Sequence, residues 1–184
     1  MSRDVDGRIL EATHALLTEH GFARLTVEAV AERAGVAKTT IYRRHRNAAD
    51  LATAAIAHAD SDVDAAAAHP DDLRAALRAF LRTFAAKLEG VGLDVLGAML
   101  AEPDGELLVL HRERVVVPHR DQLAAMVVAA QARGEVRADV DPLLAIELLV
   151  GSFFSRHIAG RELPAEVWAE QAVELLWRGI GPER

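Results

Sequence analysis

Apolar residues recur along this chain three or four positions apart, which is the spacing of amphipathic α-helices. The first such stripe lies within residues 4–20 and consists of Ile9, Ala12, Leu16 and Leu17. Gly21 follows it, as a residue suited to end a helix with a positive φ. No stretch of useful length alternates with the period of a strand. The pattern predicts an all-α fold.

Two short helices separated by a glycine turn follow the first helix. Thr26 is a candidate N-cap of the first short helix, whose apolar stripe is Val27, Val30, Ala31 and Ala34. Gly35 lies where the chain must reverse with a positive φ. A second short helix is expected over residues 37–44, with Ile41 turned inward. Residues 4–46 thus form a three-helix unit with a helix-turn-helix pattern.

The outer face of the second short helix is basic, hydroxyl-rich and aromatic. Between Arg33 and Arg46 there are five Lys or Arg residues and no acidic residue. This composition predicts binding to double-stranded DNA. The residues expected to approach base edges or adjacent phosphates, called the recognition face below, are Lys38, Thr39, Tyr42 and Arg43. The residues expected mainly to hold the phosphate backbone are Thr26, Thr40, Arg44 and Arg46.

The rest of the chain also has a helical pattern, so we expect a DNA-binding domain at residues 1–46 and a larger helical domain at 47–184. Asn47 is a candidate N-cap with Asp50 three positions later, an Asp variant of the capping box. Further helices are expected at residues 47–68, 71–88, 93–100, 107–132, 141–157 and 164–178. Pro118 should kink or break the fourth of these. Glycines at 90, 92, 134 and 179 are expected to end helices.

The segment 143–154 is apolar on all sides and has one charged residue, Glu147. Such a helix is covered on more than one side. It is either the central helix of its domain or a helix that faces a second subunit. The broad apolar side of the last helix favours the second interpretation, a four-helix interface in a homodimer. The residues expected in that interface are Leu144, Leu148, Gly151, Phe154, Trp168 and Leu176.

The distribution of charge along the chain and the amino-acid composition indicate which part is acidic and in which compartment the protein acts. The net charge is −7, but residues 1–51 contain eight basic and seven acidic residues, so the excess negative charge lies beyond the helix-turn-helix. A local basic face can meet phosphates while an acidic body stays off the duplex. The absence of cysteine fits a reducing compartment, and no apolar run is long enough for a membrane span or resembles a signal peptide. We therefore expect a cytoplasmic protein without a membrane partner.

Residues 9–51 resemble the N-terminal domain of the TetR family of bacterial transcriptional regulators. The matching positions are Ile9, Gly21, Phe22, Thr26, Val27, Val30, Ala31, Ala34, Gly35, Val36, Thr40, Ile41, Tyr42 and Leu51. The resemblance implies a homodimeric repressor of a palindromic operator, which releases the DNA when a small molecule binds the C-terminal domain. Two positions depart from the family pattern. His45 replaces an aromatic residue after the recognition helix, and Ala48 replaces a phosphate-binding lysine.

A small-molecule effector is expected between the helices of the larger domain, in a mostly apolar pocket. The candidate lining residues are Phe80, Phe84, Met99, Leu100, His111 and Met126, each of which could instead be an ordinary core residue. Because the chain has few aromatic residues, we expect an apolar ligand of modest size.

Other chemistries have weaker support in the sequence. No phosphate-binding glycine loop, dinucleotide fingerprint, nucleophile elbow or HExxH motif occurs, so we expect neither an enzyme nor a cofactor. Asp60, Asp62 and Asp64 have the spacing of calcium ligands, but the glycine and glutamate of a calcium loop are absent. His58, His111 and His119 are more typical of single polar residues than of a metal site. The alternative function is that of a small-molecule-binding or enzymatic helical protein that does not bind DNA.

Overall fold

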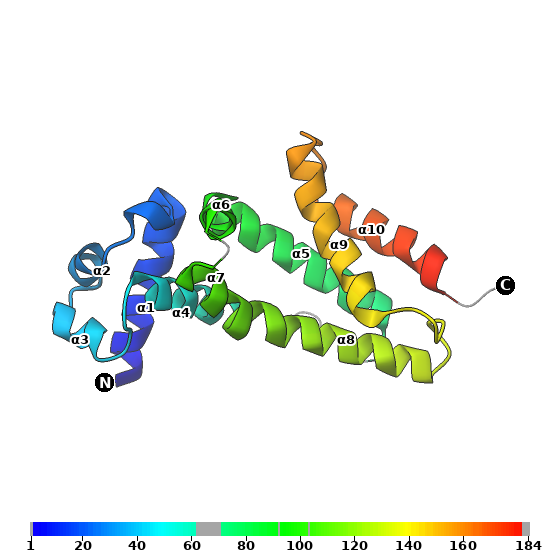
Figure 1. Cartoon of the computed structure of the whole chain (residues 1–184), viewed down its shortest axis with the longest axis horizontal. Coiled ribbons are helices and arrows are strands. Elements are labelled where there is room, and N and C mark those ends of the chain that lie inside the picture. Colours follow the sequence, from blue (N-terminus) through cyan, green and yellow to red (C-terminus); the bar gives the residue numbers. More distant parts are fainter. Residues whose placement is uncertain (1, 62–70, 92, 103, 182–184) are drawn as a thin grey trace. The chain divides into compact units, whose positions relative to one another are not determined.

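The computed structural model describes residues 2–61, 71–91, 93–102 and 104–181, and within these ranges the regular elements are all helical (Figure 1). This confirms the predicted all-α fold. The elements are α1 (Ser2–His20), η1 (Phe22–Arg24), α2 (Val27–Ala34), α3 (Lys38–Tyr42), α4 (Ala48–Ser61), α5 (Leu73–Val91), α6 (Leu93–Ala101), α7 (Glu106–His111), η2 (Arg112–Val116), α8 (Val117–Ala132), α9 (Pro142–Ile158) and α10 (Ala165–Ile180). Of the two η elements, η1 is a 3₁₀ turn and η2 is π-helical.

Contacts within the chain divide it into two compact units. The first unit comprises residues 1–63 and 87–117, and the second comprises residues 64–86 and 118–184. The first unit therefore contains the predicted helix-turn-helix together with α4, α6, α7 and η2. The domain boundary expected between residues 46 and 47 stays a prediction.

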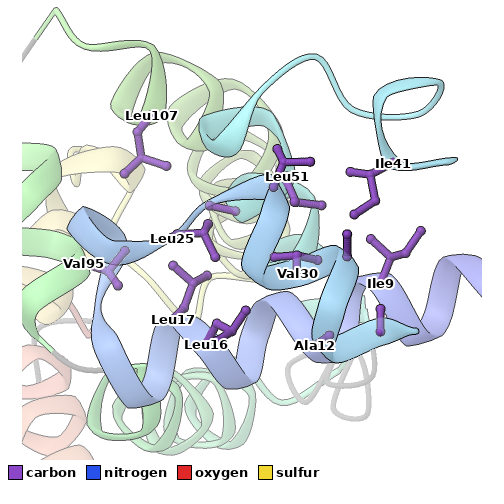
Figure 2. Close-up of a cluster of buried hydrophobic side chains, with 14 of the residues drawn as sticks. Ile9, Ala12, Leu16, Leu17, Leu25, Val30, Ile41, Leu51, Val95 and Leu107 are labelled. Atoms are coloured by element: carbon purple, nitrogen blue, oxygen red, sulfur yellow. The ribbon is translucent and has the colours of Figure 1, made fainter. Parts of the chain in front are cut away.

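The core of the first unit forms where the apolar stripes of α1, α2, α3 and α4 meet (Figure 2). Ile9, Val30, Ile41 and Leu51, one from each helix, have no exposed surface. Burying a side chain of this size is worth about 1.5–3 kcal/mol, so these four positions hold α3 against the other helices. The predicted inward position of Ile41 is confirmed.

The turn of the helix-turn-helix has the expected local chemistry. The Thr26 hydroxyl accepts a hydrogen bond from the N–H of Ala29 at 3.1 Å, which confirms Thr26 as the N-cap of α2. Gly35 has φ +64°, in the left-handed region that glycine adopts without strain. The N–H of Val36 donates to the carbonyl of Ala31 at 3.0 Å, as in a Schellman motif. This motif ends α2 and fixes the direction in which α3 begins.

The start of α4 confirms Asn47 as its N-cap, because the N–H of Asp50 donates to Asn47 Oδ1 at 2.9 Å. The capping box differs by one residue from the expected form. The Asp50 carboxylate accepts from the backbone N–H of Arg46 at 2.9 Å, one position before the N-cap.

Several predicted helix ends are wrong. The helix expected over residues 37–44 ends at Tyr42, because Arg44 and His45 both donate their N–H to the Ile41 carbonyl in a turn. Gly90 and Gly179 were expected to end helices, but α5 and α10 continue through them to Val91 and Ile180. A glycine within a helix costs about 1 kcal/mol, and each of these helices ends one residue after its glycine. The predicted helix 47–68 is described as far as Ser61, and its remainder lies outside the described residues, as does Gly92.

The predicted interruption at Pro118 is confirmed. The α-helical segment α7 ends at His111 and gives way to the five-residue π-helical stretch η2, and α8 starts one residue before the proline. Pro118 has no N–H to donate to the preceding turn, so the regular hydrogen-bond ladder cannot pass through it. The wider turn of η2 rotates each side chain by a smaller angle than an α-helix does.

The second unit is built around aromatic rings of α5, α9 and α10. The ring of Phe153 has no exposed surface and lies 5.3 Å from the Phe84 ring centre, 5.6 Å from that of Phe154 and 5.3 Å from that of Trp168. The guanidinium of Arg156 lies over the Phe153 ring at 4.9 Å. Asp141 caps α9 through its carboxylate and Pro142 opens the helix, as expected.

Candidate DNA-binding face

The recognition face is exposed on the side of α3 opposite its buried residue. Lys38, Thr39 and Arg43 are exposed, and Tyr42 is 53% exposed, whereas Ile41 has no exposed surface. The Schellman turn and the buried Ile41 fix the helix, so the exposed side chains project from a rigid support. This arrangement suits insertion of α3 into a major groove.

Acidic side chains from outside the predicted basic stretch pair with most of its cations. The Lys38 ammonium lies 2.9 Å from the Glu28 carboxylate, and Arg33 pairs with Glu19 at 2.5 Å. Donation from Lys38 lowers the pKa of Glu28, and donation from Arg33 lowers that of Glu19. These pairs are exposed to solvent and individually weak, so DNA phosphates can displace them.

Arg44 and Arg46 differ in how firmly they are held. The half-buried Arg44 forms an ion pair with Asp6 of α1, and its Nη1 donates to the Thr40 carbonyl at 3.1 Å. Arg44 therefore links α1 to the end of α3, and this structural role leaves it less available for phosphate than expected. Arg46 is exposed, with its guanidinium 3.4 Å from Glu106.

Arg43 is the exception among the five cations between residues 33 and 46. No acidic side chain of the described residues pairs with it, and it is exposed at the end of α3. Its guanidinium can therefore meet DNA without first breaking an ion pair. An arginine in this position can donate two hydrogen bonds to one guanine.

His45 and Ala48, where the sequence departs from the family pattern, are both half-buried. Burial lowers the pKa of His45, although the nearby carboxylates of Asp50 and Asp6 act in the opposite direction. Burial therefore favours the neutral form of His45, which adds no positive charge to the DNA-binding face. Arg46 remains as the exposed cation near the start of α4.

Sequence reasoning missed the acidic partners of the basic face. Asp6 and Glu19 come from α1, Glu28 from α2 and Glu106 from α7, and no periodicity within the stretch 33–46 indicates them. Arg114, which donates to Asp50 at 2.6 Å, was also missed.

The predicted interface residues fall into three groups by exposure. Leu144 and Leu148 are 53% and 59% exposed on α9, and Gly151 has no atom within 4 Å of where a Cβ would lie. Trp168 is 4% exposed, and its indole N–H donates to Ser152 at 3.0 Å, so the structure places it in the core of its own unit. Phe154 and Leu176 are half-buried, and Phe154 packs on Phe84 with ring centres 6.0 Å apart.

Further exposed apolar residues lie on the same two helices, which are side by side in Figure 1. Ile158 of α9 is 89% exposed, and Leu175 and Val167 of α10 are 76% and 40% exposed. Leu144, Leu148, Gly151 and Ile158 follow helical spacing along α9, so they form one stripe. We call Leu144, Leu148, Gly151, Ile158, Val167 and Leu175 the apolar face.

The predicted effector residues are divided between the units. Phe80 and Phe84 stack with ring centres 5.9 Å apart in the aromatic cluster of the second unit. Met126 is half-buried and belongs to the same unit. Met99 is 4% exposed in the core of the first unit, beside a surface hollow of about 250 Å³, whereas the adjacent Leu100 is 63% exposed. His111 is half-buried in the first unit. Leu100 thus points away from the core that holds Met99, and the pair does not form one lining.

The described residues also bear on the possibility of a metal site or a membrane span. Among the described side chains, no group of three or more His, Asp or Glu lies close enough to hold a metal ion. The Asp60, Asp62 and Asp64 side chains lie outside the described part of the chain. Within that part, no helix has both the length and the apolar character needed to cross a membrane.

Two family models match the chain, one in each half. Residues 9–55 match the model described as bacterial regulatory proteins of the tetR family, and residues 67–176 match that of the tetracyclin repressor-like C-terminal domain. The chain is 31% identical over 182 residues to YdeS of Bacillus subtilis (strain 168), an uncharacterized HTH-type transcriptional regulator, and the match covers 94% of this chain and 87% of YdeS.

Solved structures have the same fold. The TetR family transcription regulator SCO0332 is 31% identical, with a TM-score of 0.74, and the match covers 97% of this chain and all of that one. FadR of Bacillus subtilis, solved in complex with stearoyl-CoA, is 19% identical with a TM-score of 0.71, covering 95% of this chain and 98% of that one. These relatives are transcriptional regulators, which as a class are not enzymes.

Proposed function

This chain belongs to the TetR family of bacterial transcriptional regulators, and we propose that it is a repressor that binds a palindromic operator as a homodimer and releases it on binding a small molecule. The observation that carries the proposal is the exposed recognition face on a rigid α3, with Arg43 unpaired among the described residues. The place of action is the cytoplasm, where bacterial DNA is found.

Binding to DNA is the first matter to test. The protein is mixed with the DNA upstream of its own gene and with a pool of random-sequence duplexes, and bound DNA is separated by gel shift and sequenced. We expect a recovered sequence with two-fold symmetry and half-site centres about 34–36 Å apart, or a multiple of that distance. Recovery of no preferred sequence would contradict the proposal and favour a helical protein that does not bind DNA.

Arg43 and Arg46 are expected to contribute differently to operator binding. Arg43→Ala should weaken binding by about 1–3 kcal/mol and relax the preference at one base pair, because a bidentate contact to a base edge is lost. Arg46→Ala should weaken all sequences alike and lower the salt slope by about one unit, because a phosphate contact is lost. The measurement is operator affinity at several salt concentrations, on the operator and on variants of each base pair.

A conservative substitution separates base reading from simple charge. Arg43→Lys keeps the positive charge but cannot form the planar two-bond contact, so it should retain the salt slope and still lose the base preference. If Arg43→Lys kept the full base preference, or if both alanine variants bound as the wild type does, the recognition face would be assigned wrongly.

A palindromic operator requires two subunits, and the apolar face is the surface through which we expect the second subunit to bind. Its leucine, isoleucine and valine side chains are uncovered on α9 and α10 of one protomer. Two copies related by a two-fold axis bring the same surface of each together. An open Gly151 lets two helices approach closely at their crossing. An interface of this kind buries about 2,000 Å² or more.

The effector site is proposed to lie beside the aromatic cluster of the second unit, with Phe84 between Phe80 and Phe153. An apolar ligand of modest size suits such a lining. FadR shows that a protein of this fold can hold an acyl-CoA, so acyl-CoA thioesters of graded chain length are the first probes. A ligand that acts as effector must raise the melting temperature and reduce operator binding together, because it has to favour the state that does not bind DNA.

Phe84→Trp tests this location. The larger ring should fill space beside Phe80 and Phe153 and weaken ligand binding by about tenfold or more, while operator binding in the absence of ligand is retained. Ligand affinity is measured by calorimetry or by the shift in melting temperature. Val128→Trp, at an exposed position of the second unit outside the candidate lining, is the matched control and should leave ligand affinity unchanged. Equal affinities for the Phe84→Trp variant and the wild type would place the effector elsewhere.

A further inference from the structure

Two side chains of the segment α7–η2 contact the chain that leaves the recognition helix. Glu106 accepts a hydrogen bond from Asn47 Nδ2 at 2.7 Å, and Arg114 donates from Nη1 to Asp50 Oδ1 at 2.6 Å. All four residues belong to the first unit. Neither Glu106 nor Arg114 lies on the DNA-binding face described above, yet Glu106 contacts the connection between α3 and α4, and Arg114 contacts the first turn of α4 that follows it.

Asp50 links Arg114 to the connection between α3 and α4, because its carboxylate also accepts a hydrogen bond from that connection. Its second oxygen, Oδ2, accepts the backbone N–H of Arg46 at 2.9 Å, and its own N–H donates to Asn47 at 2.9 Å. The Asp50 side chain is 7% exposed. A carboxylate so poorly exposed depends on its partners, and removing one of them leaves a charge without compensation. Arg114 therefore helps to determine how firmly the backbone of Arg46 is held.

The two carboxylate oxygens of Glu106 contact the side chains of two neighbouring residues, Arg46 and Asn47. Oε2 accepts from Asn47, while Oε1 lies 3.4 Å from the Arg46 guanidinium. This second contact is between exposed groups and is weak by itself. Together with Asp50, however, it directs both the backbone and the side chain of Arg46 toward the α7–η2 segment.

The π-helical stretch helps Glu106 and Arg114 act on the same connection. They are eight residues apart, and eight residues of ideal α-helix rotate by two turns plus about 80°. Arg114 lies within η2, whose wider turn rotates less per residue and so reduces that angle. The interruption ahead of Pro118 thus turns Arg114 toward the side of the helix that carries Glu106.

We propose that Arg114 is a positioning residue for operator binding, which holds the Arg46 backbone through Asp50 and, with Glu106, orders the connection that follows Arg43. This inference rests on the proposed DNA-binding function. A connection that is ordered before binding does not have to be ordered during binding, so less of the contact energy is lost. Without the Arg114 contact, Arg43 and Arg46 keep their charges but lose their fixed direction.

Arg114→Ala is the variant that tests the inference, on the duplex that the wild type selects from the random pool. We expect operator affinity to fall about tenfold, because the bond to a charged acceptor is lost. The salt slope should stay at the wild-type value, since Arg114 contacts Asp50 and not a phosphate. Arg112→Ala removes the same charge from the same π-helical stretch, where Arg112 is exposed and has no acidic partner among the described residues. Its affinity should stay within about twofold of wild type.

A pH profile distinguishes positioning from a general loss of stability. Burial by itself would raise the pKa of Asp50, but the Arg46 N–H and the Arg114 guanidinium lower it below the usual value. In Arg114→Ala that pKa rises, so operator affinity should begin to fall at a higher pH than in the wild type. Arg46 and His45 also lie near Asp50, and Arg114 lowers the pKa of His45 as well, so the wild type and Arg114→Ala are compared in a His45→Gln background, where a change at His45 cannot be mistaken for one at Asp50.

The outcomes separate this inference from the function on which it rests. A wild type that selects no sequence overturns both. A wild type that binds, with Arg114→Ala equal to it in affinity and pH profile, overturns the positioning role alone. So does an equal loss in Arg112→Ala, or a reduced salt slope in Arg114→Ala. If the alanine variant does not fold, Arg114→Gln keeps one donor for Asp50, and we expect from it a loss of about threefold with a smaller shift of the pH profile in the same direction.

Discussion

Replacing Leu148 with arginine is expected to separate the homodimer into monomers and to weaken operator binding by about a hundredfold or more, because two linked half-site contacts become one. Leu148 is 59% exposed at the middle of the apolar stripe on α9, one turn from Leu144. Its burial in an interface contributes about 1.5–3 kcal/mol. An arginine there would lose that contribution and place two unpaired charges opposite each other across the two-fold axis.

Light scattering at micromolar concentration and a gel shift on the selected duplex measure the two effects. Val128→Arg is the matched control, because Val128 is 53% exposed on α8 of the same unit but lies outside the apolar face. It should remain dimeric and bind DNA. The interface assignment would be refuted by a wild type that is monomeric at micromolar concentration and still binds a palindromic operator tightly.

Phe153→Ala is expected to destabilise the protein by about 3–5 kcal/mol, the largest loss of stability among these substitutions. The ring has no exposed surface, and its removal leaves a cavity bounded by Phe84, Phe154 and Trp168. The Arg156 guanidinium would also lose the ring over which it lies. Neighbouring rings are stiff, so the cavity can close only in part.

Urea unfolding at fixed protein concentration measures this effect, since the apparent stability of a dimer depends on concentration. Phe22→Ala removes the same atoms from a half-buried position in the first unit and should cost clearly less. A loss below about 1 kcal/mol at Phe153, or equal losses at both positions, would show that the aromatic cluster does not hold the second unit together.

The helices and the caps of the DNA-binding unit could be predicted because their causes are local. Thr26, Gly35 and Asn47 act on backbone groups within a few residues, so their roles follow from the order of the residues. Helix ends at glycine were less predictable. Gly90 and Gly179 lie one residue before the ends of their helices, because a single glycine costs only about 1 kcal/mol and does not determine the last helical residue.

The partners of the basic face could not be predicted, because they arise from tertiary contacts. Asp6 and Arg44 are 38 residues apart, and Asp50 and Arg114 are 64 apart. The same limit affected the interface. The apolar pattern identified α9 and α10, but it could not tell that Trp168 turns inward while Leu175 remains uncovered. Helical spacing assigns residues to a face, and only the packed structure shows which faces are already occupied.

The isolation of Arg43 has a consequence for how regulators of this type diverge. Arg44 links α1 to the end of α3 through Asp6 and the Thr40 carbonyl, so a change at Arg44 also disturbs the protein itself, whereas the exposed ion pairs of Lys38 and Arg33 stabilise the unit only weakly. Arg43 is exposed and unpaired among the described residues, and substitutions at such positions typically change stability by less than about 0.5 kcal/mol. A duplicated gene can therefore acquire a new operator by mutation at this codon while its product remains folded, and the set of genes under its control can change before any other part of the protein does.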